Sequence, residues 1–346
     1  MNRIGRSEQQ ACEVIAEAGI NHNGDLGTAK RLVDAAADAG ADTVKFQTFQ
    51  TEEIVTRDTE RAGYQKRAGD SSQYEMLEAV ELQKSDHFAL QEYCQNRGIE
   101  FLSTPYDPGS VSLLEELDVD RYKIASADII NKPLLKSVAD TGKPVILSTG
   151  MASLGEIERA VEFLQTHGCD SVVLMYCVSC YPATPDDIDM QCIDTLRRTF
   201  GVPVGFSDHT RGTSVPIIAA GNGASVIEKH FTLDRSMEGP DHEASLEPSE
   251  LERMVNGIRT ATAVEGDGTI KQPPCERENR PQMRRSLHVC RDISAGAELA
   301  EDDLIVVRPD DGISPWKIDD VVGCTTKRDL KAQESVTWND IRKRAV

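Results

Sequence analysis

Short apolar runs alternate with amphipathic stretches along most of the chain, and this alternation limits the folds available to it. The runs are rich in β-branched or apolar residues, end at glycine, proline or polar turn residues, and lie near 13–19, 43–47, 99–105, 121–126, 144–150, 171–177, 202–208 and 225–231. Several are apolar without alternation, which is typical of strands covered on both faces. The pattern therefore predicts buried parallel strands.

Helical segments separate most of these strands. Apolar residues recur at i, i+3 and i+4 spacing within 27–40, 85–98, 153–168 and 247–262. The expected N-caps and helix-ending glycines are Ser85, Ser153, Gly40, Gly98 and Gly168. Eight strand–helix alternations predict an α/β fold, the (β/α)8 barrel. An open doubly wound sheet is the alternative, but no Gly-x-Gly-x-x-Gly motif follows the first strand.

The alternation stops near residue 266, which divides the chain into predicted domains. Residues 1–268 are expected to form the barrel, and the proline-rich and charged stretch 269–285 is expected to form a linker. Residues 286–346 are expected to form a small, mostly β domain. Within it, 292–304 and 329–341 resemble each other, which predicts two similar β units packed face to face.

The net charge of −20 argues against several classes of partner. Long-range repulsion disfavours nonspecific binding to nucleic acid and to anionic membrane surfaces. No window approaches the roughly 18 consecutive apolar residues of a membrane span, and no secretory apolar run begins the sequence, so a cytoplasmic location is expected. The nine cysteines are then expected to be reduced thiols, with Cys177 and Cys180 as the one close pair in the sequence.

Residues near the carboxyl ends of the strands face one pocket in a (β/α)8 barrel. In this sequence they are mostly polar: Glu17, Lys45, Gln47, Ser103, Thr104, Lys123, Ser126, Asp128, Ser148, Thr149, Ser179, Tyr181, Ser207, Asp208, His209, Lys229 and His230. The lysines can balance negative charge, and the hydroxyls can donate to phosphate or carboxylate oxygens. A single serine at such a place usually caps a helix, but the whole set predicts a pocket for a small phosphorylated acid.

Two histidines and one glutamate carry the expected chemistry. His209 and His230 follow successive strands, and two neutral imidazoles with substrate oxygens and water suit an open divalent site such as that of Mn²⁺. Asp208, between Ser207 and His209, is expected to orient its neighbours. Burial of Glu17 in the first strand is expected to raise its pKa, which suits it to proton transfer.

Two loops are expected to cover this pocket. Residues 61–82, between the second and third strands, form a longer connection than the others and could serve as a lid. Asp241 lies in a loop rich in glycine and proline after the eighth strand. Both segments follow strands at the carboxyl end, where the connections of a (β/α)8 barrel carry function.

With these residues assembled, the chain resembles the sialic acid synthase family, including N-acetylneuraminate and N,N′-diacetyllegionaminate synthases, over nearly its full length. The motifs that carry the resemblance are EAGINHNG, ADTVKFQTF, FLSTPYD, YKIASAD, KPVILSTGM, YCVSCYPATP, GFSDHT, IEKHFT and MEGPDHEASLEP. The tail SAGAELAEDDLIVVRP is similar to the antifreeze-like SAF domain. The resemblance implies a (β/α)8 barrel followed by a small, mostly β SAF domain.

The resemblance also implies the condensation of phosphoenolpyruvate with N-acetylmannosamine, or a diacetamido-dideoxy-mannose analogue, and water, to give a nine-carbon 2-keto acid and phosphate. It implies that phosphoenolpyruvate binds Lys45, Thr104, Lys123, Ser126, Ser148 and Ser207, and that Mn²⁺ binds His209 and His230. The implied sugar contacts are Gln47, Asp128, Ser179, Tyr181, Asp241 and Arg308. Arg308 would reach the partner subunit's sugar site in a domain-swapped homodimer.

Two departures from the family pattern leave the sugar open. Asp128 stands where a glutamate often occurs, and Ser179 stands where an asparagine occurs. Two other functions remain as alternatives: a metal-dependent aldolase or phosphoenolpyruvate condensing enzyme with another aldose, and a carbohydrate-binding or ice-binding protein whose barrel does not catalyse. The intact glutamate, histidines and lysines at the strand ends argue against the second.

Overall fold

The computed structural model describes residues 12–61 and 72–343, and the chain divides into two compact units, Met1–Gly266 and Asp267–Val346. The strands of the larger unit are β1 (Glu13–Gly19), β2 (Thr43–Thr48), β3 (Glu100–Pro105), β4 (Tyr122–Ile124), β5 (Val145–Ser148), β6 (Val172–Cys177), β7 (Val204–Asp208) and β8 (Val226–His230). Its helices are α1 (Leu26–Asp38), α2 (Thr51–Ile54), α3 (Gln73–Glu78), α4 (Lys84–Arg97), α5 (Pro108–Glu116), α6 (Lys132–Ala139), α7 (Leu154–Thr166), α8 (Gln191–Phe200), α9 (Ser214–Gly221) and α10 (Pro248–Val264). The expected strands are confirmed.

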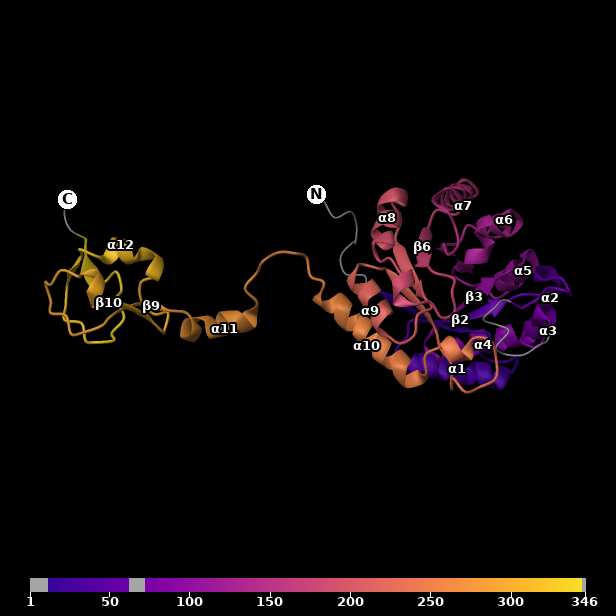
Figure 1. Cartoon of the computed structure of the whole chain (residues 1–346), viewed down its shortest axis with the longest axis horizontal. Helices are drawn as coiled ribbons and strands as arrows, with labels where there is room; N and C mark the ends of the chain where they lie inside the picture. The colour runs from indigo at the N-terminus through magenta and orange to yellow at the C-terminus, as the bar shows by residue number, and fades with distance from the viewer. Residues whose placement is uncertain (1–11, 62–71, 344–346) are drawn as a thin grey trace. The chain divides into compact units, whose positions relative to one another are not determined.

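The strands of the larger unit form a nearly closed barrel. All of them pair in parallel in the order β3-β2-β1-β8-β7-β6-β5-β4, and β4 lies beside β3. Figure 1 shows the helices around the outside of these strands. Inside the barrel a separate apolar layer contains Ile15, Leu102, Ile146, Met175 and Val226. The expected (β/α)8 fold is confirmed, and its filled centre confines the polar groups to the two ends.

Local capping explains where the helices begin and end. Ser153 is the N-cap of α7, as expected, and its backbone N–H donates to Glu156 at 2.8 Å. The prediction for Ser85 is wrong, because α4 begins at Lys84 and its N-cap is Gln83, two residues earlier. The Gln83 N–H donates to Asp86 at 3.2 Å. The glycines expected to end helices, Gly40, Gly98 and Gly168, all have positive φ, which favours glycine.

A network of charged side chains closes the amino end of the barrel. Arg121, just before β4, donates through Nε to Glu100 at 2.8 Å and through Nη1 to Glu13 at 2.9 Å. Its Nη2 donates to both carboxylates and to the Thr43 hydroxyl. Glu13, Thr43 and Glu100 are the first residues of β1, β2 and β3. One planar guanidinium therefore ties four neighbouring strands together.

Part of the expected lid can be placed. Residues 62–71 lie outside the described residues. The helix α3 follows them, and its first turn is capped by the Ser72 hydroxyl, which accepts from the Glu75 N–H at 3.2 Å. Beyond α3, Val80 packs with Ile20 and Phe49 in a small apolar cluster. The described part of this insertion is thus attached to the loops that follow β1 and β2.

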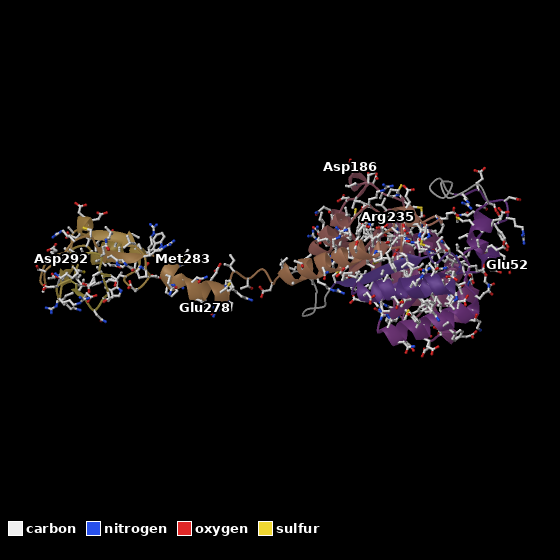
Figure 2. All side chains as sticks on the ribbon, turned by 90° about the horizontal axis from the view of Figure 1, so that it is seen from below. Glu52, Asp186, Arg235, Glu278, Met283 and Asp292 are labelled. Carbon is white, nitrogen blue, oxygen red and sulfur yellow. The ribbon has the colours of Figure 1, made fainter. Side chains whose placement is uncertain are left out.

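The smaller unit contains α11 (Pro274–Met283), α12 (Ile318–Val321) and the strands β9 (Ser286–Val289), β10 (Leu304–Val307), β11 (Thr325–Thr326) and β12 (Ile341–Arg342). β9 pairs with β10, and β11 pairs with β12, both antiparallel. The helix α11 lies within the expected linker, and its side chains, including Glu278 and Met283, are not buried (Figure 2). Among the described residues, no helix has both the length and the apolar character needed to cross a membrane.

The sequence repeat of the smaller unit appears as a set of reciprocal contacts. Ile293 and Leu330 exchange both backbone hydrogen bonds, at 2.9 and 2.8 Å. The Asp292 side chain accepts from the Ala332 N–H at 2.9 Å, and the Asp329 side chain accepts from the Ala295 N–H at 2.7 Å. Arg291 pairs with Asp303 as Arg328 pairs with Asp340. The prediction of two similar, mutually packed units is confirmed.

Candidate active site

The alternation of side chains along the strands selects the groups that meet inside the carboxyl end of the barrel. Glu17 of β1 lies in register with Lys45 of β2 and His230 of β8. Ser207 of β7 lies in register with Glu228 of β8. Because alternate residues of a strand face the same side, Glu228 faces the same side as His230. These residues form one continuous polar group across four adjacent strands.

Lys45 is the first cation of this group. Its Nζ lies 2.8 Å from Glu17 Oε2 and donates to Thr104 Oγ1 at 2.9 Å. Gln47, two residues further along β2, donates to Glu17 Oε1 at 3.4 Å. Lys45, Glu17 and Thr104 are all buried. An ammonium group and a hydroxyl are therefore presented together at the strand ends.

Lys123 is the second cation. Its Nζ donates to Ser148 Oγ at 2.6 Å. Glu228 lies between the two lysines, with Oε2 3.7 Å from Lys123 Nζ and 3.8 Å from Lys45 Nζ. Glu228 Oε1 accepts from the Ser207 hydroxyl at 3.0 Å, whereas Oε2 has no hydrogen-bond partner among the described residues. The cluster is balanced in charge and incompletely hydrogen-bonded.

The two glutamates have opposite pKa shifts. Burial, reinforced by the negative charge of Glu228, raises the pKa of Glu17 to about 7 against the opposing effect of Lys45. Burial also acts on Glu228, but the ammonium groups of Lys123 and Lys45 outweigh it and lower the pKa of Glu228 to about 2. Glu228 is therefore a permanent anion, while Glu17 can gain or lose a proton near neutral pH.

Two further serines flank the main chain that follows β5. The Gly150 N–H donates to Ser126 Oγ at 3.0 Å. A Cβ at Gly150 would lie 2.3 Å from Ser179 Oγ and 2.9 Å from Ser126 Oγ, so this close approach requires glycine. Ser126 and Ser179, from the segments that follow β4 and β6, thus lie near one another, while Ser148 is the last residue of β5.

The two predicted metal-binding histidines lie close together. The ring centroids of His209 and His230 are 5.5 Å apart, and the Tyr181 ring lies 4.0 Å from that of His209. His209 Nδ1 is 2.8 Å from the Val178 carbonyl oxygen, so this nitrogen carries the proton and Nε2 keeps a lone pair. His230 Nδ1 is buried and has no hydrogen-bond partner among the described residues. Burial, with the neighbouring His209, holds the pKa of His230 well below its usual value.

This donor set fits a divalent cation with open positions. One imidazole is fixed in its tautomer by a carbonyl, and the other is neutral and unsatisfied. No group of three metal-binding His, Cys, Asp or Glu side chains occurs within residues 12–61 and 72–343. The remaining ligands of such an ion would be substrate oxygens and water.

The expected sugar-binding residues occupy different parts of the molecule. Asp241 Oδ2 lies 3.8 Å from His230 Nδ1, and burial raises the pKa of Asp241 to about 6. Asp128 lies in the 3₁₀ turn Ser126–Ile130 after β4 and accepts from Asn131 at 3.0 Å. Arg308 follows β10 in the smaller unit. Gln47, Tyr181 and Asp241 thus join the group around Glu17 and the histidines.

The expected role of Asp208 is wrong. Its side chain accepts from the Thr210 N–H at 2.9 Å and from Lys229 Nζ at 2.6 Å, instead of pairing with the His209 imidazole. Asp208 and Lys229 are one residue out of phase with Ser207 and Glu228, so they face away from the inside of the barrel. Ser103 behaves in the same way and pairs with the Thr48 hydroxyl at 2.6 Å.

Two residues of the site were missed from the sequence. Glu228 lies inside β8 and not at its end, so the strand-end pattern does not include it, although its i, i+2 relation to His230 predicts the shared face. Cys177, the last residue of β6, has its Sγ 3.8 Å from His209 Nδ1. Burial would raise the pKa of Cys177, but the hydrogen bond with His209 and the nearby Lys123 ammonium group lower it.

Comparison with known proteins agrees with this barrel and its smaller unit. The NeuB family matches residues 32–270, and the SAF domain matches residues 284–342. The chain belongs to the NeuB family.

Individual relatives narrow the class further. The N,N′-diacetyllegionaminic acid synthase of Legionella pneumophila is 44% identical over 97% of this chain and 96% of the relative. The enzyme of the same name from Campylobacter jejuni is 42% identical over 93% of this chain and 98% of the relative. Human N-acetylneuraminate-9-phosphate synthase is 33% identical over 91% and 88%, respectively. These relatives make this chain an enzyme, a synthase of the sialic acid type.

Solved structures agree with the fold. An N-acetylneuraminic acid synthetase from Leptospira borgpetersenii has a TM-score of 0.69 and 39% identity, over 78% of this chain and 90% of that one. A spore coat polysaccharide biosynthesis protein from Bacillus subtilis has a TM-score of 0.65 and 33% identity, over 98% and 97%. The second structure matches almost the whole length of both chains.

Proposed function

We propose that this enzyme condenses phosphoenolpyruvate with an N-acylated mannosamine-type sugar and water, giving a nine-carbon 2-keto acid and phosphate. The observation that carries the proposal is the pair of buried lysines, from β2 and β4, set beside hydroxyls and two glutamates of unlike pKa. A small, highly charged acid is the ligand that such a group can hold.

Phosphoenolpyruvate would lie across the two lysines. Lys45 and Lys123 would supply the positive charge for its phosphate and carboxylate groups, with Thr104, Ser126, Ser148 and Ser207 as hydrogen-bond partners. The contacts of Lys45 with Thr104 and of Lys123 with Ser148 set the spacing of these groups before ligand binds. Glu228, fixed as an anion between the lysines, would hold both ammonium groups in place.

His209 and His230 would hold the divalent cation, with Mn²⁺ as the expected ion. When bound, this ion would supply Lewis acidity toward the carbonyl of the open-chain sugar. The orphaned Nδ1 of His230 and the carbonyl-fixed tautomer of His209 support this assignment. Asp241, 3.8 Å from His230, lies where it can meet the same sugar.

The reaction needs proton transfers, and we assign one of them to Glu17. The C2–C3 π electrons of phosphoenolpyruvate form a bond to the sugar aldehyde carbon, whose oxygen takes up a proton from solvent. Water then adds at C2 and gives one proton to Glu17. The C–O bond to phosphate then breaks, and the remaining hydroxyl proton leaves with the phosphate, which gives a ketone. A carboxyl group with a pKa of about 7 can accept that proton and release it again near neutral pH.

The sugar would be recognised by Gln47, Asp128, Ser179, Tyr181 and Asp241, together with Arg308 from the partner subunit of a domain-swapped homodimer. The similarity to two N,N′-diacetyllegionaminic acid synthases favours a diacetamido sugar, whereas N-acetylmannosamine remains the second candidate. Arg308→Ala is expected to raise the KM for the sugar about tenfold and that for phosphoenolpyruvate less than twofold. Equal effects on both would contradict the assignment of Arg308.

Phosphate release with a panel of sugars tests the function. The panel contains N-acetylmannosamine, 2,4-diacetamido-2,4,6-trideoxymannose and aldoses without the mannose configuration, each with phosphoenolpyruvate and Mn²⁺. Release with either acylated mannose supports the proposal and selects the sugar. Release only with other aldoses indicates another condensing enzyme, and no release with any sugar indicates a binding protein. His209→Ala is the control and is expected to abolish turnover while the fold is kept.

A further inference from the structure

Residues 231–247 form the loop between β8 and α10, and this loop includes Asp241. Backbone hydrogen bonds join its two arms at the base. The Thr232 N–H donates to the Leu246 carbonyl at 2.8 Å, and the Leu246 N–H donates to the His230 carbonyl at 2.9 Å. These bonds fix where the loop leaves and rejoins the barrel. They do not fix the tip, where Asp241 lies.

The tip is held by side chains of the β1–α1 loop. Asn23 donates through Nδ2 to the Glu238 carbonyl at 2.8 Å, and its Oδ1 lies 3.2 Å from His242 Nε2. Asn21 donates to Ser245 Oγ at 3.0 Å, and this hydroxyl donates to the Asp241 carbonyl at 2.6 Å. The residues on either side of Asp241 are therefore tied to a segment that follows the strand of Glu17.

The pairing of Asn23 with His242 has a definite polarity. Asn23 uses its amide N–H on the Glu238 carbonyl, so its oxygen faces His242 and can only accept. His242 must then donate from Nε2, which leaves Nδ1 to accept from the Thr232 hydroxyl at 2.6 Å. His242 is 1% exposed, and burial lowers its pKa. Each nitrogen of the neutral imidazole therefore has a hydrogen-bond partner.

The main chain of the loop at Gly239 packs directly against Asn23 and His242. A Cβ at Gly239 would lie 2.6 Å from His242 Cδ2 and 2.9 Å from Asn23 Oδ1, and Gly239 has a φ of +151°. Any larger residue would have to displace the ring or the amide. The turn that precedes Asp241 is thus shaped against His242 and Asn23.

We infer that His242 and Asn23 are positioning residues that hold the loop tip so that Asp241 faces His230, and that they thereby set the affinity for the sugar. This inference rests on the proposed function for the identity of that substrate. It assigns no contact between His242 and any ligand. Loss of the Asn23–His242 bond would let Asp241 move away from the site, while the two lysines that would bind phosphoenolpyruvate stay in place.

Four single variants and one double variant, Asn23→Gly with His242→Asn, test the inference. Asn23→Gly removes the amide and keeps the left-handed backbone, because Asn23 has a φ of 54°. His242→Asn keeps a polar group near Thr232 but is too short to reach Asn23, whereas His242→Gln can present an amide N–H at the Nε2 position. His167→Asn, at the exposed C-cap of α7, is a matched control far along the chain.

We expect Asn23→Gly and His242→Asn each to raise the KM for the sugar about tenfold and that for phosphoenolpyruvate less than twofold. His242→Gln is expected to stay within about threefold of the wild type, and the double variant to be no worse than His242→Asn alone. Equal rises in both KM values, a fall in kcat alone, or multiplicative effects in the double variant would overturn the inference.

Hydrogen exchange gives a readout that needs no substrate. Peptides from residues 232–247 should exchange about tenfold faster in Asn23→Gly and His242→Asn, with peptides from β2 and β3 unchanged. Faster exchange in an enzyme that releases no phosphate with any sugar would keep the positioning role and reject the proposed function. Unchanged exchange in an active enzyme would reject the positioning role. Should His242→Asn not fold, Asn23→Gly carries the same test, because the Asn23 side chain is exposed.

Discussion

The two ends of the barrel carry clusters of charged side chains that are similar in composition. The two clusters differ in how completely their hydrogen bonds are formed. At the amino end, every nitrogen of the Arg121 guanidinium donates to Glu13, Glu100 or both. At the carboxyl end, the ammonium groups of Lys45 and Lys123 lie beyond hydrogen-bonding distance of Glu228 Oε2. The planar guanidinium matches carboxylates edge to edge, whereas an ammonium group is a point charge.

This difference separates a structural network from a binding site. A buried ion pair with all its hydrogen bonds formed offers nothing further to a ligand, and breaking it exposes uncompensated charge. An incompletely bonded cluster retains capacity for another charged group, and its competing charges shift pKa values, as with Glu17 and Glu228. Four predictions about the two ends test this distinction.

The largest effect is expected at the carboxyl end. Lys123→Met removes one of the two cations of the proposed phosphoenolpyruvate site and should lower kcat/KM for phosphoenolpyruvate about 1,000-fold. Steady-state phosphate release measures this change. Lys143→Met is the control, because Lys143 pairs with Glu115 at 2.8 Å outside the cluster. A loss below tenfold would mean that Lys123 serves the fold alone.

At the amino end, a substitution should change the stability of the protein and not its activity. Arg121→Met leaves the carboxylates of Glu13 and Glu100 facing each other and should lower the free energy of unfolding by about 3 kcal/mol. This value is at the low end of the stability loss for breaking a buried ion pair, because the side chains of Arg121, Glu13 and Glu100 are 19%, 22% and 34% exposed. Denaturant titration measures it, and kcat/KM of the folded variant should stay within twofold. A large loss of activity without a loss of stability would reverse the assignment of the two ends.

A matched pair of threonines sharpens the contrast. Thr104→Val removes the acceptor of the Lys45 hydrogen bond and should raise the KM for phosphoenolpyruvate about tenfold. Thr43→Val removes a hydroxyl that contacts Arg121 and Glu13, and should lower stability by about 1 kcal/mol without changing KM. The same chemical change thus has different consequences at each end. Identical effects from both variants would show that the ends are equivalent.

The smallest expected effect is a shift in pH dependence. The negative charge of Glu228 helps to raise the pKa of Glu17, so Glu228→Gln should lower that pKa. If Glu17 must be ionised to accept a proton, the limb of kcat/KM that rises near pH 7 in the wild type should move to lower pH. Profiles from pH 5 to 9 measure it. A limb that moves to higher pH, or one that stays in place, would remove Glu17 from that role.

The fold was readable from the sequence because its elements are local and repetitive. Each strand run is apolar and bounded by turn residues, so all eight starts fall within two residues of the prediction. The missed cap shows the limit of this reasoning. Ser85 has the right residue type, but the reciprocal reach of Asp86 to the Gln83 N–H decides where α4 begins. The start of α4 depends on a hydrogen bond between a side chain and the backbone, and residue type alone does not reveal that bond.

The structure brings together the lysines and the histidines that the sequence placed at the carboxyl ends of strands, because these ends meet inside one end of the barrel. The direction of individual side chains was harder to predict. Asp208 was misread because it stands between Ser207 and His209, and a neighbour in sequence faces the opposite side of a strand. The tie between Asn23 and His242 joins residues far apart in the chain, so no local pattern signals it.

The exchanged contacts of the smaller unit bear on how that unit can be built. Asp292 and Asp329 each bond to a backbone N–H of the opposite half, and Ile293 and Leu330 do the same through the main chain. Neither half contains the partners for its own turn. A fragment that ends between them would therefore lack both sets of contacts at once, so neither half is expected to keep its turn without the other.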